Sequence, residues 1–204
     1  MPRAPQLELT DVLPMLPRES KALPRAGAWH FSFKYDGYRT LATRDQLRTR
    51  GGADATAWFP EIPAALAALP AGHHIIDGEV SVLENGVSNF VLLHERAMHR
   101  RWYAGAAPVV LCAFDLLVHA GQDIRGKPIE ERTERLADVV MGLPGVLFVS
   151  SIDDGPTAWA AVMALQLEGL VAKRWGSLSV GGPTRDWLKI KRPGATLPGF
   201  RREL

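Results

Sequence analysis

One short segment near the N-terminus, KYDGYR, places an amine, a carboxylate and a guanidinium close together between Lys34 and Arg39. Alternating polar and apolar residues from Trp29 to Phe33 predict a strand, and Asp36 with the glycine after it predicts a tight turn into a second strand. Lys34 would then lie at the rim of a sheet, where its amine can point into a cleft. A surface hairpin with solvated charges fits this segment equally well, so other residues must decide.

Further charged residues recur inside predicted strands, where apolar side chains are usual. Outside the first segment they are Asp77, Glu79, Glu168, Lys173, Lys189 and Lys191. Lys189 and Lys191 are two positions apart, so both side chains leave the same face of a strand. They repel each other unless an anion lies between them, and a phosphate is the obvious candidate. The alternative is the polar face of an edge strand, because lysine commonly protects sheet edges.

The chain as a whole is predicted to form one α+β domain. The predicted strands span residues 29–34, 38–43, 45–50, 74–83, 109–118, 146–150, 168–173 and 186–191. The predicted helices span residues 60–69, 88–101, 128–140 and about 156–167. Helices and short strands mix without a regular β-α-β alternation, which favours largely antiparallel sheets. Residues 1–28 are rich in proline, leucine and arginine without periodicity, so we expect an irregular lead-in that packs on the domain.

Composition sets broad limits on the class of protein. The 204 residues carry a net charge of only +2, so any surface for nucleic acid must be local. The single cysteine, Cys112, lies in an apolar segment and can form neither an internal disulfide nor a zinc cluster. The sequence shows no signal-peptide core and no apolar segment of about 18 residues. We therefore expect a cytoplasmic protein without a membrane partner.

Several segments, taken in order, resemble a known family. Residues 34–39, 77–80, 114–117, 168–174 and 187–191 look like motifs I, III, IIIa, IV and V of the ATP-dependent DNA ligases. Residues 49–52, 59–61, 86–90 and 185–187 are similar to segments of the bacterial end-joining branch of that family. The resemblance implies the nucleotidyltransferase fold of ligases and capping enzymes. This fold is α+β, with two largely antiparallel sheets flanked by helices, and is similar to that of ATP-grasp proteins.

The resemblance also implies a ligation reaction that uses ATP. AMP would move from ATP onto Lys34 as a phosphoramidate and then onto a 5′-phosphate of DNA, where a 3′-hydroxyl displaces it. A lysine amine attacks only when neutral, and a free lysine is almost wholly protonated at neutral pH. Lys189, Lys191 and a bound metal would favour loss of that proton. Lys189 and Lys191 also resemble the pair that holds the α-phosphate and neutralises its charge during transfer.

Other positions take nucleotide and metal roles by the same resemblance. Glu79 looks like the acceptor of a ribose hydroxyl, and Phe114 looks like the ring that stacks on adenine. Lys173 resembles a second nucleotide contact, with a salt-bridged strand residue as the alternative. Glu168 resembles the ligand for a catalytic Mg²⁺ or Mn²⁺, which a hard oxygen donor suits. Ser32 stands where the family usually has a glutamate that helps to read adenine, which leaves the strictness for ATP open.

Three residues resemble contacts to the break in DNA. Arg39 and Arg50 look like the pair that engages the 5′-phosphate, and Arg39 is also expected at the nucleotide. Asp36 resembles the acid that supports the later steps. The expected partner is nicked or broken duplex DNA, and the expected location is the bacterial nucleoid.

The resemblance also divides the chain. Residues 29–192 would form the nucleotidyltransferase domain, and residues 193–204 a tail too short for the five-stranded OB-fold that follows motif V in ligases. Without that domain, self-adenylation is expected to be slow or to need an OB-fold domain or end-joining proteins in trans. Sealing of a nick that is already adenylated would survive.

Two other interpretations remain open at this point. An RNA ligase or capping-type nucleotidyltransferase shares the lysine motif, although residues 59–61 and 185–187 favour the DNA branch. A non-catalytic module that binds nucleotides or DNA ends in a repair complex is also compatible with a missing OB-fold domain. The complete set of Lys34, Glu79 and Glu168 with the two C-terminal lysines argues against it, because a binding module needs no nucleophile.

Overall fold

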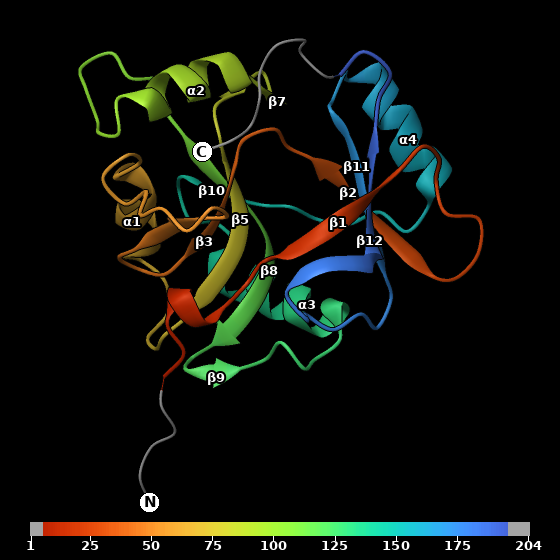
Figure 1. Cartoon of the computed structure of the whole chain (residues 1–204), viewed down its shortest axis with the longest axis horizontal. Coiled ribbons are helices and arrows are strands. Elements are labelled where there is room, and N and C mark those ends of the chain that lie inside the picture. The colour runs from red at the N-terminus through yellow and green to blue at the C-terminus, as the bar shows by residue number, and fades with distance from the viewer. Residues whose placement is uncertain (1–5, 196–204) are drawn as a thin grey trace, which may run out of the picture.

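Lys34 and both C-terminal lysines belong to one four-stranded sheet. The computed structural model describes residues 6–195. The order in this sheet is β1 (Met15–Ser20), β12 (Gly182–Lys191), β11 (Gly169–Arg174) and β2 (Trp29–Lys34). β1 runs parallel to β12, and the other neighbours are antiparallel. Helix α4 (Gly155–Ala164) covers the apolar face of the sheet, as the right half of Figure 1 shows.

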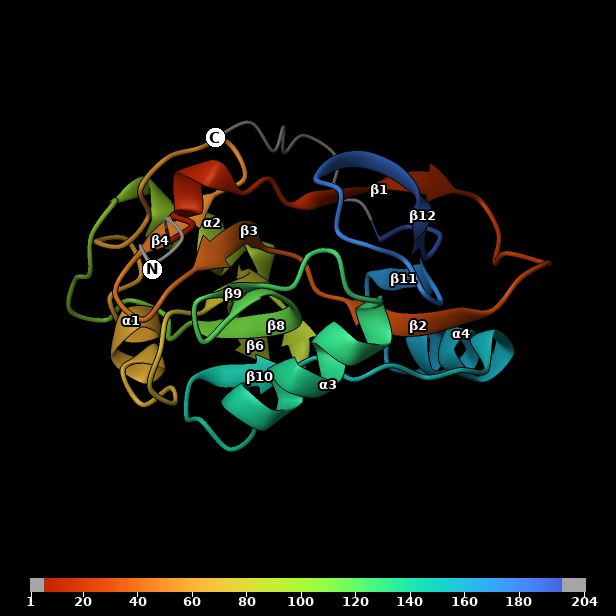
Figure 2. The same ribbon diagram turned by 90° about the horizontal axis from the view of Figure 1, so that it is seen from below.

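The second sheet carries Arg39, Glu79 and Phe114. Its main strands are, in order, β10 (Val146–Phe148), β8 (Val110–His119), β5 (Ile75–Ser81), β3 (Tyr38–Ala42) and β4 (Leu47–Thr49), with the short β9 (Gln122–Asp123) paired to β8. β10 is parallel to β8, and the remaining pairs are antiparallel. Figure 2 shows the two sheets side by side, with the segment that leads into β1 running from the second sheet to the first.

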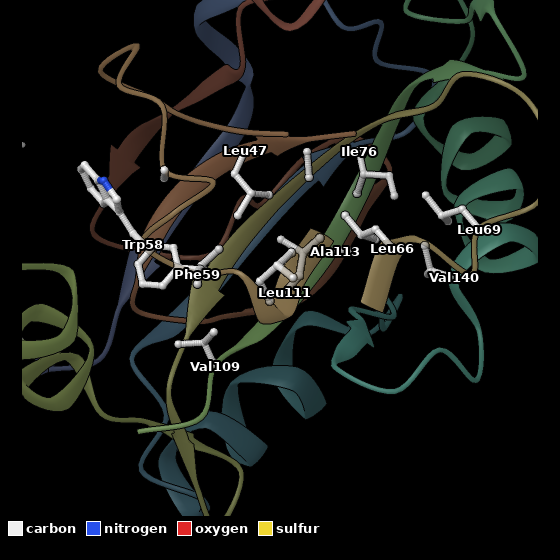
Figure 3. Close-up of a cluster of buried hydrophobic side chains, with 14 of the residues drawn as sticks. Leu47, Trp58, Phe59, Leu66, Leu69, Ile76, Val109, Leu111, Ala113 and Val140 are labelled. Carbon is white, nitrogen blue, oxygen red and sulfur yellow. The ribbon is translucent and has the colours of Figure 1, made fainter. Parts of the chain in front are cut away.

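The largest hydrophobic core lies between the second sheet and three helices (Figure 3). The helices are α1 (Glu61–Leu66), α2 (Phe90–Met98) and α3 (Ile129–Val140). Each contributes apolar side chains to this core, for example Leu66 from α1 and Val140 from α3, both fully buried. Asn89 caps α2, because its side chain accepts a hydrogen bond from the Leu92 amide at 3.1 Å.

The N-terminal segment differs from the prediction of an irregular lead-in. Residues 9–11 form a short 3₁₀ turn, and residues 15–20 form strand β1. This strand was not predicted because Pro17 and the charges beside it interrupt the pattern that is typical of a strand. The structure tolerates this proline because β1 is an edge strand, and the register with β12 shifts between Pro17 and Arg18. Of the predicted tail at 193–204, residues 193–195 form a turn, and the rest lies outside the described residues.

The turn at Asp36-Gly37 also differs from a hairpin. β2 pairs with β11, whereas β3 pairs with β4 and β5, so this turn carries the chain from one sheet to the other. Gly37 is required by close packing, because a Cβ at this position would lie 2.0 Å from the carbonyl oxygen of Val80. A hairpin β6 (Leu83–Glu84) and β7 (Val87–Ser88), which the sequence did not predict, follows β5.

The predicted fold class is otherwise confirmed. Two largely antiparallel sheets with few helices form the described part of the chain, and each predicted strand and helix is present within a few residues of its expected ends. No helix among residues 6–195 is long and apolar enough to cross a membrane.

Candidate active site

A cavity of about 370 Å³ opens between the two sheets. The predicted site residues in its wall are Lys34, Arg39, Arg50, Glu79, Phe114, Lys173, Lys189 and Lys191. Asp36 and Glu168 line an adjoining cavity of about 230 Å³, which shares Lys34 with the first. All of the predicted residues thus line one of two adjoining cavities that share Lys34. A cavity of this size can hold a nucleotide.

Strand register places two lysines beside one carboxylate. Gly169 is the partner of Lys34 on β2 and of Lys191 on β12, so Glu168 lies next to both amines. The Lys34 amine donates a hydrogen bond to Glu168 Oε2, and Lys191 Nζ lies 3.5 Å from Glu168 Oε1. These three side chains are at most one quarter exposed, which strengthens their attraction.

The direct contact with Glu168 changes the expectation for Lys34. From the sequence, the neighbouring lysines were expected to favour the neutral amine. In the structure, the Lys34 amine also donates a hydrogen bond to the Glu168 carboxylate, a contact that the sequence did not predict.

Glu79 lies on β5 in the wall of the same cavity. Its removal from water raises the pKa of its carboxyl group from 4.5 to about 7, although the positive charges of Lys34 and Arg39 oppose the shift. Near neutral pH this group can either accept or donate a hydrogen bond. That behaviour suits a partner such as a sugar hydroxyl, which can do both.

This shift in pKa predicts that Glu79→Gln changes stability in a pH-dependent way. Between pH 4.5 and about 7, folded Glu79 keeps a proton that the unfolded chain has released. The stability from this group is therefore present below pH 4.5 and is lost as the pH rises through 7. Relative to wild type, the Gln variant should gain on the order of 2–3 kcal/mol in unfolding free energy between pH 5 and pH 8, as measured by urea unfolding. If the unfolding free energies of the two proteins differed equally at pH 5 and pH 8, the raised pKa of Glu79 would be contradicted.

Arg39 is held beneath Phe114 and does not extend into solvent. Its Nε and Nη2 atoms donate to the two oxygens of Asp77 at 2.5 and 2.8 Å. The guanidinium lies 4.3 Å from the centroid of the Phe114 ring. Two nitrogens of the guanidinium are thus used by a buried carboxylate. Arg39 supports the ring that was predicted to stack on adenine, and its contact with the 5′-phosphate of DNA stays a prediction.

Lys173 also lies close to the Phe114 ring, with 5.0 Å between its Nζ and the ring centroid. Its Nζ donates to the carbonyl oxygen of Phe114 at 2.8 Å and lies 4.4 Å from the centroid of the Trp187 ring. Burial lowers the pKa of its ammonium group to about 8, an effect that Arg39 and Arg132 increase and Asp115 opposes. The partner is therefore a main-chain oxygen, not the salt bridge considered as an alternative for this strand residue.

The remaining predicted residues lie toward the mouth of the cavity. Arg50 is exposed, and its amide donates to the carbonyl oxygen of Arg39 at 2.9 Å. The Asp36 amide donates a hydrogen bond to Ser88 Oγ at 3.0 Å, and Ser81 Oγ donates to the Asp36 carbonyl oxygen at 3.0 Å. Lys189 is one third exposed and lies 3.9 Å from Glu19.

Sequence reasoning missed the buried ion pairs behind the cavity. Asp77 was recognised as a charge inside a strand, but its partner Arg39 was assigned elsewhere. Asp115 and Arg132 form a second pair, with two contacts of 2.8 Å between fully buried side chains. A single aspartate within an otherwise apolar strand was the available signal. Ser32, also unassigned to a partner, shares a hydrogen bond of 3.2 Å with Ser151 in the wall of the cavity.

The arrangement fits a nucleotide. Lys34, Lys189 and Lys191 supply positive charge for phosphates at one part of the cavity wall. Phe114 supplies an aromatic face for a base, and Glu79 a carboxyl group for a sugar hydroxyl. A lysine amine in the same cavity is the arrangement found in one class of proteins, the nucleotidyltransferases that act through a covalent lysyl-nucleotide.

Comparison with known proteins gives the family. A family model described as the ATP dependent DNA ligase domain matches residues 14–191. The multifunctional non-homologous end joining protein LigD of Mycolicibacterium smegmatis is 36% identical over 196 residues, which cover 89% of this chain and 24% of LigD. The solved ligase domain of LigD from M. tuberculosis superposes with a TM-score of 0.79 at 29% identity, covering 91% of this chain and 61% of that domain.

A second solved structure bears on the nucleotide. Mycobacterial DNA ligase D complexed with ATP and MES superposes with a TM-score of 0.79 at 30% identity, over 91% of this chain and 62% of that one. This chain belongs to the ATP-dependent DNA ligase family and contains the family's catalytic domain. The comparisons favour neither an RNA-ligase or capping enzyme nor a non-catalytic module. The chain spans about a quarter of the length of the LigD relatives.

Proposed function

We propose that this chain forms a lysyl-AMP at Lys34 from ATP and seals 5′-phosphate/3′-hydroxyl breaks in duplex DNA. The observation that carries the proposal is the position of the Lys34 amine. It lies against Glu168 and beside Lys191, in a cavity whose wall also contains Phe114 and Glu79. An amine, a charge-neutralising lysine and a base-stacking ring are the groups that adenylate transfer requires.

The predicted residues in the cavity wall each take one part in the transfer of AMP. The Lys34 amine is the nucleophile, and Lys189 and Lys191 bind the α-phosphate and stabilise the charge that builds up on its oxygens. Phe114 holds the adenine ring. Glu79 binds the ribose hydroxyls, and Lys173 keeps Phe114 in place through the main-chain oxygen of that residue.

Glu168 is the residue that would hold a divalent cation. Residues 6–195 contain no group of three or more His, Cys, Asp or Glu side chains that could hold a metal by themselves. Mg²⁺ and Mn²⁺ are commonly bound by one or two carboxylates with phosphate oxygens, which fits a single glutamate here. Bound at Glu168, the ion would neutralise phosphate charge, and its positive charge would favour the neutral Lys34 amine.

The DNA side of the reaction takes place at the cavity mouth. Exposed Arg50 binds the 5′-phosphate of the break, and Asp36, next to the nucleophile, supports the attack of the 3′-hydroxyl. The substrate is nicked or broken duplex DNA in the cytoplasm, at the bacterial nucleoid. An OB-fold domain or end-joining proteins in trans would accelerate the first step, which needs the pyrophosphate of ATP aligned for departure. Residues 29–192, completed by β1, form the nucleotidyltransferase domain.

A duplex with one pre-adenylated nick tests the DNA part of the proposal. We expect the wild-type protein to join this nick with Mg²⁺ and no ATP, because the later steps use only the described residues. Glu168→Gln should slow joining on the order of 100-fold, since it removes the anionic ligand. The same nick in an all-RNA duplex serves as the matched control and should be joined poorly. Failure on DNA, or preference for RNA, would overturn the proposal.

A further inference from the structure

A basic and aromatic surface lies outside the cavity, at the end of helix α2. It consists of His99, Arg100, Arg101, Trp102 and Tyr103, called here the 99–103 surface. Four of its residues are exposed, and Trp102 is 53% exposed. Exposed arginines next to an exposed indole are unusual unless the surface meets a partner.

The two arginines of this surface have no acidic partner nearby. The ion pairs among residues 6–195 with N–O distances up to 4.0 Å include neither Arg100 nor Arg101. The nearest acid in the sequence is Glu95, one helical turn earlier on α2 and also exposed. Arg96, by contrast, is buried and paired with Glu61. The surface therefore presents uncompensated positive charge.

The structure holds Arg100 in one place. Its guanidinium lies 5.6 Å from the centroid of the Trp58 ring, and the Trp58 carbonyl oxygen accepts a hydrogen bond of 3.4 Å from Arg96. Arg100 has a φ of +52°, a backbone conformation that favours glycine or asparagine at a helix end. The rings of His99 and Tyr103 pack with centroids 4.3 Å apart, which fixes the remainder of the loop. A preorganised guanidinium gains more from binding an anion than a mobile one.

Helix α2 connects this surface to the active site. Phe90, the first residue of the helix, lines the same cavity wall as Lys34, and the helix has 9 residues. At a rise of about 1.5 Å per residue, the helix ends about 14 Å from the cavity. Figure 1 shows α2 along the upper side of the molecule, with the 99–103 loop at its far end. A spacing of about 14 Å corresponds to about four base pairs of duplex DNA.

We propose that the 99–103 surface binds the phosphate backbone of duplex DNA on one side of the break, about four base pairs away. This inference rests on the proposed function. Arg100 and Arg101 supply the phosphate contacts, and Trp102 packs against the sugars at the groove edge. The surface would thus add to the grip on DNA that the local charge of the cavity provides, in a protein whose net charge is only +2.

The test compares two double variants with equal loss of charge. Arg100→Gly with Arg101→Ala keeps the positive φ at residue 100, and Lys21→Ala with Arg25→Ala removes two exposed charges from the β1–β2 loop. Binding of a nicked duplex is measured by fluorescence anisotropy at several salt concentrations. For the first variant, the plot of log K against log salt should become less steep, with the magnitude of its negative slope smaller by about 2. The affinity for the duplex should be on the order of 10- to 100-fold lower. For the second, both quantities should stay at the wild-type values.

A shortened duplex locates the contact. When one arm of the duplex is cut to fewer than about four base pairs, the difference between wild type and the Arg100/Arg101 variant should vanish. When the other arm is cut, the difference should remain. The proposal would be overturned if this difference in affinity persisted when either arm was cut. It would also be overturned if the variant lost more affinity for single-stranded DNA than for duplex DNA.

A further readout separates this proposal from the proposed function. Formation of lysyl-AMP needs no DNA, so the Arg100/Arg101 variant should form it at the wild-type rate. Wild-type affinity of that variant for DNA, with lysyl-AMP formation and nick joining intact, would overturn only the DNA surface. If the wild-type protein itself formed no lysyl-AMP, that result would count against the proposed function.

Discussion

Replacing Lys34 with arginine should abolish ATP-dependent joining of an ordinary nick, by on the order of 10⁴-fold or more. Arginine keeps a positive charge beside Glu168 but does not lose its proton in proteins, so it cannot act as a nucleophile. Removing a nucleophile is among the largest single effects known for enzymes. Joining of a fluorescent nicked duplex with ATP and Mg²⁺ measures the loss.

The same variant provides its own internal control. Sealing of a pre-adenylated nick does not pass through a lysyl-AMP, so Lys34→Arg should keep this activity within about tenfold. Lys21→Arg, a change at an exposed lysine in the β1–β2 loop, should leave both activities unchanged. ATP-dependent joining by Lys34→Arg at the wild-type rate would show that another residue carries AMP.

Replacing Asp115 with asparagine should lower the unfolding free energy by about 3–5 kcal/mol. Asp115 and Arg132 are both fully buried, and the change leaves the guanidinium without its counter-charge. Arg132 also donates to the carbonyl oxygens of Lys127 and Ser177, so the effect should spread from α3 to the β11–β12 loop. Urea unfolding measures the loss.

An exposed ion pair serves as the matched control for this prediction. Asp186→Asn removes one partner of Arg174, in a pair whose side chains are each 46% exposed, and should change stability by at most about 1 kcal/mol. Removing both buried partners, in Asp115→Asn with Arg132→Met, should restore part of the stability because no charge is then left buried. Equal effects of Asp115→Asn and Asp186→Asn would contradict the role of burial.

Local patterns in the sequence were sufficient for most of the fold, whereas the residues around Lys34 were named mainly by the family resemblance. Alternation along residues 186–191 placed Lys189 and Lys191 on one face, and the structure confirms that Ile190 packs on the other side of the sheet against α4. The Asn89 cap of α2 is likewise a local feature, because capping depends on neighbours in the sequence. These features are local, so one sequence contains them.

Features that depend on distant partners were not predictable in this way. The pair of Arg39 and Asp77 forms because β3 and β5 are neighbours, and only the strand register brings these side chains together. The same register directs the Nε and Nη2 atoms of Arg39 to Asp77. β1 was missed because Pro17 is acceptable only in an edge strand, and its place at the edge is a property of the whole sheet. The turn at Asp36-Gly37 has the composition of a hairpin, yet its strands find better partners elsewhere.

The most direct test is the site of covalent AMP on the intact protein. The protein is incubated with ATP and Mg²⁺, its mass is measured, and the modified peptide is then sequenced by mass spectrometry. The account predicts a gain of one AMP per chain, located on Lys34, and no gain for Lys34→Arg. AMP on any other residue would contradict the assignment of the nucleophile. A chain that stays unmodified even when an OB-fold domain is supplied in trans would contradict the proposed reaction itself.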